Sequence, residues 1–252
     1  MGFTTLEKQI CTLLGLLVLF PAFCTSQFTD SRATYYGSPD CYGTPTGACG
    51  FGEYGSTVNH GYVSGVSRLY ANGSGCGACY QVRCKNHQLC NSDGVNIVVT
   101  DYGEGDRTDF ILSSRAYSKL ALPNAAKELF SFGVVEVEYR RISCQYSGYN
   151  VMYKVNEHSK NPHYLALLVM YVGGQNDVTA VEIWQEDCKE WRPMRRAYGA
   201  VWDMENPPSG AVTLRFQATS STGYTYWVQS TNAIPENWEA GAAYESDVQL
   251  TN

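Results

Sequence analysis

The second half of the chain alternates short apolar runs with turn residues, a pattern typical of β-structure. A continuous apolar run over 165–172 ends at two glycines, and further β-prone runs follow at 179–185, 211–219 and 224–229. Strands of this length, separated by Gly and Asn turns, are typical of antiparallel sandwiches of about 100 residues. We therefore predict an all-β sandwich domain over residues 147–252.

The first half mixes strand patterns with two helical ones. The β-prone runs are 77–84, 94–101 and 133–141, and residues 135–139 alternate apolar and polar positions. Ser113 is a suitable N-cap for a helix ending near Leu120, and a second short helix is predicted over 124–130. We expect a strand-rich domain over 27–146, packed on the second domain because the joint at 145–150 is short.

Cysteine spacing and the N-terminus both indicate an oxidising compartment. Of ten cysteines, six lie between Cys49 and Cys144, a density that predicts disulfides. Lys8, an apolar stretch over 13–23 and small residues before position 27 predict a signal peptide at 1–26. The alternative, a membrane anchor, requires a longer apolar stretch. We expect a secreted monomer with no membrane association in its mature form.

Charge and composition narrow the possible partners. The formal net charge is -6 and no stripe of Lys and Arg is present, which argues against nucleic acid. An acidic chain is repelled by polyanions, so a neutral partner is favoured. Aromatic residues make up 13% of the chain, as core packing or as flat platforms for sugar rings. The four histidines lack ligand spacing, so we expect no metal and no cofactor.

Six stretches, in order along the chain, carry a resemblance to a known family. They are ATYYG (33–37), GACG (47–50), GCGACY (75–80), VTD (99–101), NPHYLALLV (161–169) and YGAVW (198–202). Together they resemble the plant expansin superfamily. The stretches SPDC (38–41), TDFILS (108–113) and WQEDC (184–188) make the chain most similar to its expansin-like B group.

The resemblance implies a fold, an activity and a disulfide pairing. The first domain would be a six-stranded double-psi β-barrel related to family-45 glycoside hydrolases. The second would be an Ig-like β-sandwich that binds carbohydrate. The family loosens plant cell walls without hydrolysis, by disrupting contacts of cellulose with xyloglucan or related neutral glucans. The implied disulfides are Cys49–Cys76, Cys79–Cys144 and Cys84–Cys90.

Two further cysteines, Cys41 and Cys188, are left over from this pairing. An even remainder in an oxidising compartment predicts that they form a fourth bridge joining the two domains. Two free thiols are the alternative.

The resemblance also assigns candidate residues to a sugar-binding groove, namely Thr34, Tyr36 and Asp101. Glycoside hydrolysis needs two carboxyl groups. Ile111 occupies the position of the family's general acid, and Asp109, which we also place in the groove, lies two residues earlier on the same strand face. It would be displaced by about 6–7 Å, beyond hydrogen-bond reach. We therefore predict a non-enzymatic protein, with a weak endo-β-glucanase using Asp101 and Asp109 as one alternative.

Aromatic residues of the second domain are candidates for a binding platform. Tyr164 and Tyr198 match the family's platform, and Trp191 is a plausible neighbour. We assign the other tryptophans near these strands, at positions 184, 202 and 227, to core or part-buried sites. Asn72 begins an N-glycosylation sequon. A carbohydrate-binding protein with no loosening activity is the remaining alternative.

Overall fold

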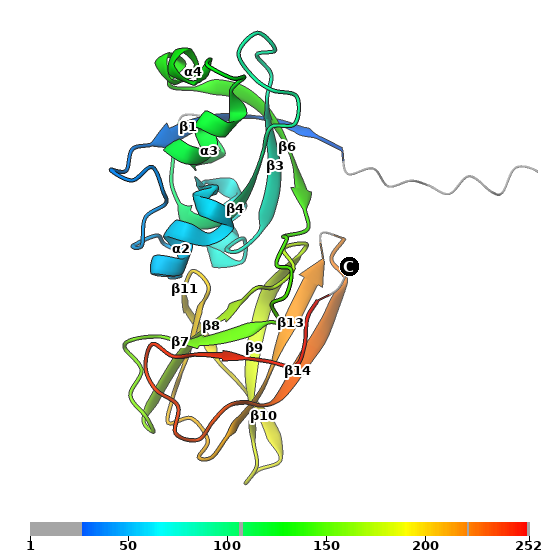
Figure 1. Ribbon diagram of the computed structural model, residues 1–252. Helices are drawn as coiled ribbons and strands as arrows, with labels where there is room; N and C mark the ends of the chain where they lie inside the picture. The colour runs from blue at the N-terminus through cyan, green and yellow to red at the C-terminus, as the bar shows by residue number, and fades with distance from the viewer. Residues whose placement is uncertain (1–26, 106–107, 221, 251–252) are drawn as a thin grey trace, which may run out of the picture.

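The computed structural model describes residues 27–105, 108–220 and 222–250, and it has a barrel packed on a sandwich (Figure 1). The signal peptide predicted at 1–26 lies outside the described residues. No helix among the described residues is long and apolar enough to cross a membrane.

Six strands close the barrel in the order β1-β5-β2-β4-β3-β6. They are β1 (Thr29–Tyr36), β2 (Val63–Val66), β3 (Cys79–Cys84), β4 (Val95–Tyr102), β5 (Phe110–Ser113) and β6 (Val135–Ile142). The pairs β1–β5 and β2–β4 are parallel and the other four pairs are antiparallel. The predicted six-stranded barrel is confirmed.

Short helices pack around the barrel. They are α2 (Glu53–Thr57), α3 (Ser114–Leu120) and α4 (Ala126–Phe132), with 3-10 turns η1 (Val58–Gly61) and η2 (Arg68–Gly73). The Ser113 hydroxyl accepts a hydrogen bond from the Ala116 backbone N–H, so it caps α3 as predicted. The sequence did not reveal α2, η1 and η2, because each is too short to show an apolar period.

The second domain is the predicted two-sheet sandwich. Its strands are β7 (Met152–Val155), β8 (Tyr164–Met170), β9 (Asn176–Gln185), β10 (Glu190–Pro193), β11 (Arg195–Tyr198), β12 (Val201–Glu205), β13 (Val212–Ser220), β14 (Thr225–Ile234) and β15 (Ala243–Glu245). One sheet has the order β10-β9-β13-β14 and the other has the order β11-β12-β8-β7-β15.

Strand β8 is buried on both of its faces. Leu165 and Leu167 point into the core between the two sheets, whereas Ala166 and Leu168 belong to the same cluster as the barrel core. Because the five-stranded sheet is covered by the barrel on its outer side, β8 reads as a continuous apolar run rather than an alternating one.

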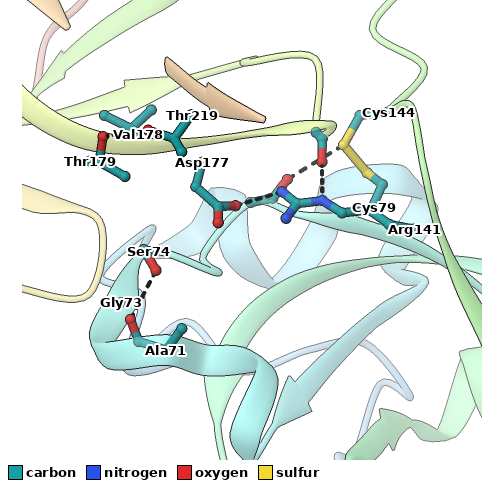
Figure 2. Close-up of polar contacts among 12 residues, drawn as sticks. Ala71, Gly73, Ser74, Cys79, Arg141, Cys144, Asp177, Val178, Thr179 and Thr219 are labelled. Atoms are coloured by element: carbon teal, nitrogen blue, oxygen red, sulfur yellow. Dashed lines mark hydrogen bonds and ion pairs between the residues drawn. A yellow bond between two sulfur atoms is a disulfide. The ribbon is translucent and has the colours of Figure 1, made fainter. Parts of the chain in front are cut away.

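Polar contacts at the joint add to this packing (Figure 2). Arg141 of β6 donates hydrogen bonds to the Asp177 carboxylate at 2.6 Å and to the Gly174 carbonyl at 2.7 Å, beside the disulfide of Cys144. The two backbones also approach closely, since a Cβ atom on Gly73 would lie 2.3 Å from the Gly199 carbonyl oxygen. The predicted boundary at 146/147 falls between β6 and β7 and stays a prediction.

Three disulfides join Cys49 to Cys76, Cys79 to Cys144 and Cys84 to Cys90, the pairing that the resemblance implied. The predicted Cys41–Cys188 bridge is wrong, because both cysteines are free and exposed. Cys41 follows β1 in the barrel, whereas Cys188 lies in the β9–β10 turn. Strand β9 starts at the joint and carries that turn roughly 25 Å away from it, at about 3.3 Å per residue.

Candidate functional site

Four neighbouring barrel strands place residues in one row on the outer face. Gly65 of β2 pairs with Asp101 of β4 on one side and with Ile111 of β5 on the other, and Ile111 pairs with Thr34 of β1. The residues that flank Ile111 and Thr34, such as Phe110 and Ala33, point into the barrel core. The row therefore contains both Asp101 and Ile111, the two positions on which a hydrolytic mechanism would depend.

A β-bulge turns Asp101 toward this face. The register of β2 against β4 shifts between Ser64, which pairs with Val99, and Gly65, which pairs with Asp101, so Thr100 is an extra residue. Val99 points into the barrel core, and simple alternation would send Asp101 the same way. Bulges re-aim side chains next to functional sites, and this one exposes the Asp101 carboxylate beside Ile111.

Tyr36 and Asp101 form the polar part of the site. The Asp101 Oδ1 atom accepts hydrogen bonds from the backbone N–H groups of Ala48 at 2.6 Å and Tyr102 at 2.8 Å. The Tyr36 hydroxyl is buried without a partner among the described residues. Burial, followed by the negative charges of Asp101 and Asp40, raises its pKa. The phenol therefore stays protonated.

Thr34 completes the barrel site, which we define as Thr34, Tyr36, Asp101 and Ile111. Its hydroxyl donates to the Gly133 carbonyl at 2.8 Å, which fixes the rotamer and leaves the oxygen able to accept a hydrogen bond. The roles of these residues toward a sugar stay predictions.

Asp109 does not belong to this site, contrary to the prediction. It is 3% exposed and precedes β5, so strand alternation does not set its direction. Its carboxylate accepts two hydrogen bonds from Arg68, at 2.9 and 2.7 Å, and others from Ser31 at 2.7 Å and Ser67 at 3.3 Å. The Arg68 guanidinium lowers the pKa of Asp109. This arrangement stabilises an ionised, buried carboxylate rather than a proton donor.

The sandwich contributes a second group of residues from the outer face of its five-stranded sheet. Tyr164 of β8 pairs with Glu205 of β12, and Tyr198 of β11 pairs with Val201 of β12. Tyr198 is 52% exposed and Tyr164 is part-buried. We refer to Tyr164 and Tyr198 as the tyrosine platform.

An ion pair that the sequence did not suggest holds Tyr164. The Tyr164 hydroxyl donates to Asp203 at 2.9 Å, and Arg195 donates two hydrogen bonds to the same carboxylate, at 3.0 and 2.7 Å. Arg195 lowers the pKa of Asp203, while burial and the Asp203 charge raise the pKa of Tyr164. No sequence motif marks Arg195 or Asp203, because their ion pair arises only from the pairing of β11 with β12.

Residues 48–50 connect the barrel site to the platform. Ala48 binds Asp101 through its N–H, and the Cys49 carbonyl accepts from the Ala200 N–H at 3.0 Å. A Cβ atom on Gly50 would lie 2.8 Å from Cε2 of Tyr198, so only glycine allows this ring so close to the barrel. The platform and the barrel site thus form one surface across both domains, which we name the binding strip.

Trp191 is not a neighbour of the platform, and that prediction is wrong. It lies on β10, which pairs with β9 at the edge of the four-stranded sheet, on the other side of the sandwich. Trp202 is buried, with 4% exposure, as expected. Trp227 is 39% exposed and not part of the core.

Two other expectations concern modification and metals. Asn72 is exposed in η2, and its use as a glycosylation site stays a prediction. Over the described residues no group of three or more metal-ligating side chains is found.

A closed six-stranded barrel followed by a β-sandwich, with one surface shared by the two, defines a two-domain class of barrel–sandwich proteins. Residues 151–235 match the family model of the expansin C-terminal domain, and residues 62–139 match the double-psi barrel model described as lytic transglycolase. The crystal structure of Clavibacter michiganensis expansin has a TM-score of 0.66 at 20% identity, covering 90% of this chain and 99% of that one.

Plant relatives are more similar in sequence. The chain is 60% identical over 238 residues to Expansin-like B1 of Arabidopsis thaliana, covering 94% of this chain and 95% of the relative. It is 42% identical over 249 residues to Expansin-like B1 of Oryza sativa subsp. japonica, covering 97% of each. The chain therefore belongs to the expansin superfamily, and its resemblance to the expansin-like B group is confirmed.

Proposed function

We propose that this chain is a secreted cell-wall protein that binds neutral glucans along the binding strip and loosens their noncovalent contacts without hydrolysis. Membership of the expansin superfamily supports the proposal. A mutant of the Clavibacter michiganensis expansin has been solved in complex with cellohexaose, which supports a β-glucan as the ligand class. Cellulose and xyloglucan are the candidate polysaccharides.

The observation that carries this proposal is the row across β4, β2, β5 and β1. Asp101 is its only carboxylate, because Ile111, on the far side of Gly65, occupies the position where a hydrolase needs a general acid. Asp109, the substitute considered from the sequence, is held by Arg68 and has a lowered pKa. A general acid needs a raised pKa and access to the ligand, whereas the pKa of Asp109 is lowered and the residue is buried.

Binding along the strip combines stacking with hydrogen bonds. The Tyr164 and Tyr198 rings offer apolar faces to sugar rings, and the Asp101 carboxylate accepts hydrogen bonds from sugar hydroxyls further along, beside Tyr36. No net positive charge is needed, because the ligand is neutral.

A hydrolytic alternative now depends on Asp40 instead of Asp109. Asp40 is close enough to Tyr36 to raise its pKa, although its Oδ1 atom accepts the Tyr42 N–H at 3.1 Å. The variants Asp101→Asn and Asp40→Asn test this alternative directly.

The decisive experiment pairs two assays on the purified mature protein. Extension of heat-inactivated plant wall strips under load measures loosening, and reducing-sugar release from cellulose, xyloglucan and mixed-linkage glucan measures hydrolysis. We expect extension without sugar release, and loss of extension in Asp101→Asn. Sugar release that either Asp variant abolishes would support the glucanase, and cellulose binding without extension would support the binding protein.

A further inference from the structure

Three tryptophans and an arginine gather on the outer face of the four-stranded sheet. The Arg215 guanidinium carbon of β13 lies 4.3 Å from the ring centroid of Trp191 and 4.4 Å from that of Trp227. Trp184 lies opposite Trp191 across β9 and β10, with ring centroids 5.4 Å apart. We name these four residues the tryptophan face.

Together with Glu182, the tryptophan face carries no net charge. Arg215 is paired with Glu182 across β13 and β9, with 2.6 Å between Nη2 and the carboxylate, and both side chains are largely buried. The cation is thus satisfied by its partner and by two aromatic rings, and it holds Trp191 and Trp227 in fixed positions.

Polar groups that suit sugar hydroxyls surround the rings. Gln217 pairs with Trp227 and Gln229 pairs with Arg215 across β13 and β14, and Gln229 is exposed. Thr179 and Thr219 are joined by a hydroxyl–hydroxyl bond at 2.8 Å on the same side. Trp227 is exposed, and Trp184 and Trp191 are part-buried. Amides and hydroxyls beside accessible aromatic rings form the chemistry that recognises an uncharged polyol.

The barrel does not cover this face. The barrel packs on the five-stranded sheet through β8, whereas β10, β9, β13 and β14 form the opposite layer of the sandwich (Figure 1). The tyrosine platform and the tryptophan face therefore lie on opposite sheets, and one ligand chain in contact with the platform leaves the tryptophans accessible.

We propose that the tryptophan face is a second binding surface for a neutral glycan chain, so that one molecule holds two polysaccharide chains at once. The inference rests on the proposed function for the platform, but its residues are separate. Charge argues for this occupant: a polyanion finds no unpaired cation, because Glu182 neutralises Arg215.

The test uses native affinity electrophoresis of the full mature protein in gels that contain soluble xyloglucan or mixed-linkage glucan. Four proteins are compared: the wild type, Tyr164→Ala/Tyr198→Ala, Trp191→Ala/Trp227→Ala and the combination. Tyr224→Ala is the matched control, since Tyr224 is 68% exposed, directly precedes β14 and lies outside the face. Thermal midpoints check folding, and Trp227→Ala alone replaces the double variant if that variant unfolds.

We expect the platform variant to keep measurable retardation and the combined variant to lose it. Removing the two tryptophans should weaken the affinity that the platform variant keeps by about tenfold, because two stacking contacts with sugar rings are lost. In a second assay, wild type bound to insoluble cellulose should retain labelled soluble xyloglucan, whereas the same bound amount of Trp191→Ala/Trp227→Ala, held to cellulose by the platform alone, should retain far less.

Three results would overturn the proposal. The first is equal retardation of the platform variant and the combined variant. The second is capture of soluble glucan that does not depend on the tryptophans. The third is a wild-type dimer in sedimentation velocity that the tryptophan variant abolishes, which would assign the face to a second copy of the chain. A platform variant that binds cellulose as strongly as the wild type would instead contradict the proposed function.

Discussion

Asp109 and Asp101, the two aspartates considered for catalysis, should differ in what their asparagine variants change. Asp109→Asn should lower stability, and Asp101→Asn should lower activity. Asp109→Asn removes the charge of a carboxylate whose side chain is 4% exposed and places an amide N–H₂ against Arg68. Two charge-assisted hydrogen bonds are weakened, each worth about 1.5–3 kcal/mol. Arg68, whose side chain is 81% exposed, recovers part of this through water. We expect a net loss of about 2–3 kcal/mol.

Asp101→Asn should behave in the opposite way. The Oδ1 atom of an asparagine can still accept from Ala48 and Tyr102, so the free energy of unfolding should change by less than about 0.5 kcal/mol. The negative charge beside Tyr36 disappears, and with it the only carboxylate of the barrel site. Wall extension should fall while folding is preserved.

Differential scanning calorimetry and wall extension measure the two effects on the same preparations. At about 2–4 °C per kcal/mol, Asp109→Asn should lower the thermal midpoint by roughly 4–12 °C and leave extension intact below that temperature. The reasoning is refuted if Asp109→Asn abolishes extension at an unchanged midpoint, because Asp109 would then act in the barrel site.

Three further outcomes are expected. Gly50→Ala should weaken cellulose binding and lower the free energy of unfolding by roughly 1–3 kcal/mol, because its Cβ would lie 2.8 Å from the Tyr198 ring. Gly148→Ala is the control for backbone strain, since Gly148 has a similar positive φ but no atom within 4 Å of its Cβ position. Asp109 and Asp203 both have pKa values that are lowered in the folded state. Their contribution to stability is therefore complete above about pH 4, the pKa of an aspartate in the unfolded chain, and is lost as the pH falls through the folded pKa values. Calorimetry should show the thermal midpoint falling below about pH 4, and falling less steeply in Asp203→Asn. Alkylation of the native mature protein should label the two free cysteines and no others, and a single bridged species would contradict the structure.

Local pattern was sufficient for most secondary structure. The apolar run of β8, the alternation of β6 and the N-cap at Ser113 each depend on neighbours within a few residues. Such signals are strong because burial on one face, or on both, imposes a period directly on the sequence. Boundaries moved by a few residues, as in α4, which begins at Ala126 rather than at 124.

Site residues were harder to place, and three examples show why. Trp191 follows Lys189 and Glu190 in a polar turn and was assigned to the wrong sheet, since nothing local says which strand β10 will pair with. Asp109 was expected on a strand face, but it lies just before β5, where a salt bridge to Arg68 decides its direction. The Arg195–Asp203 pair behind Tyr164 left no motif at all.

Sequence alone determined the two-domain β-architecture, the three disulfides through the family resemblance, and the loss of an acid at Ile111. Only the tertiary structure decided where the carboxylates and rings lie. An unpaired bulge residue at position 100 turns Asp101 outward, and long-range sheet order puts the tryptophans opposite the tyrosine platform. The period of the sequence indicates on which face of its own strand a side chain lies. Register and strand order arise from contacts distant in sequence, and they decide which residues lie next to that face.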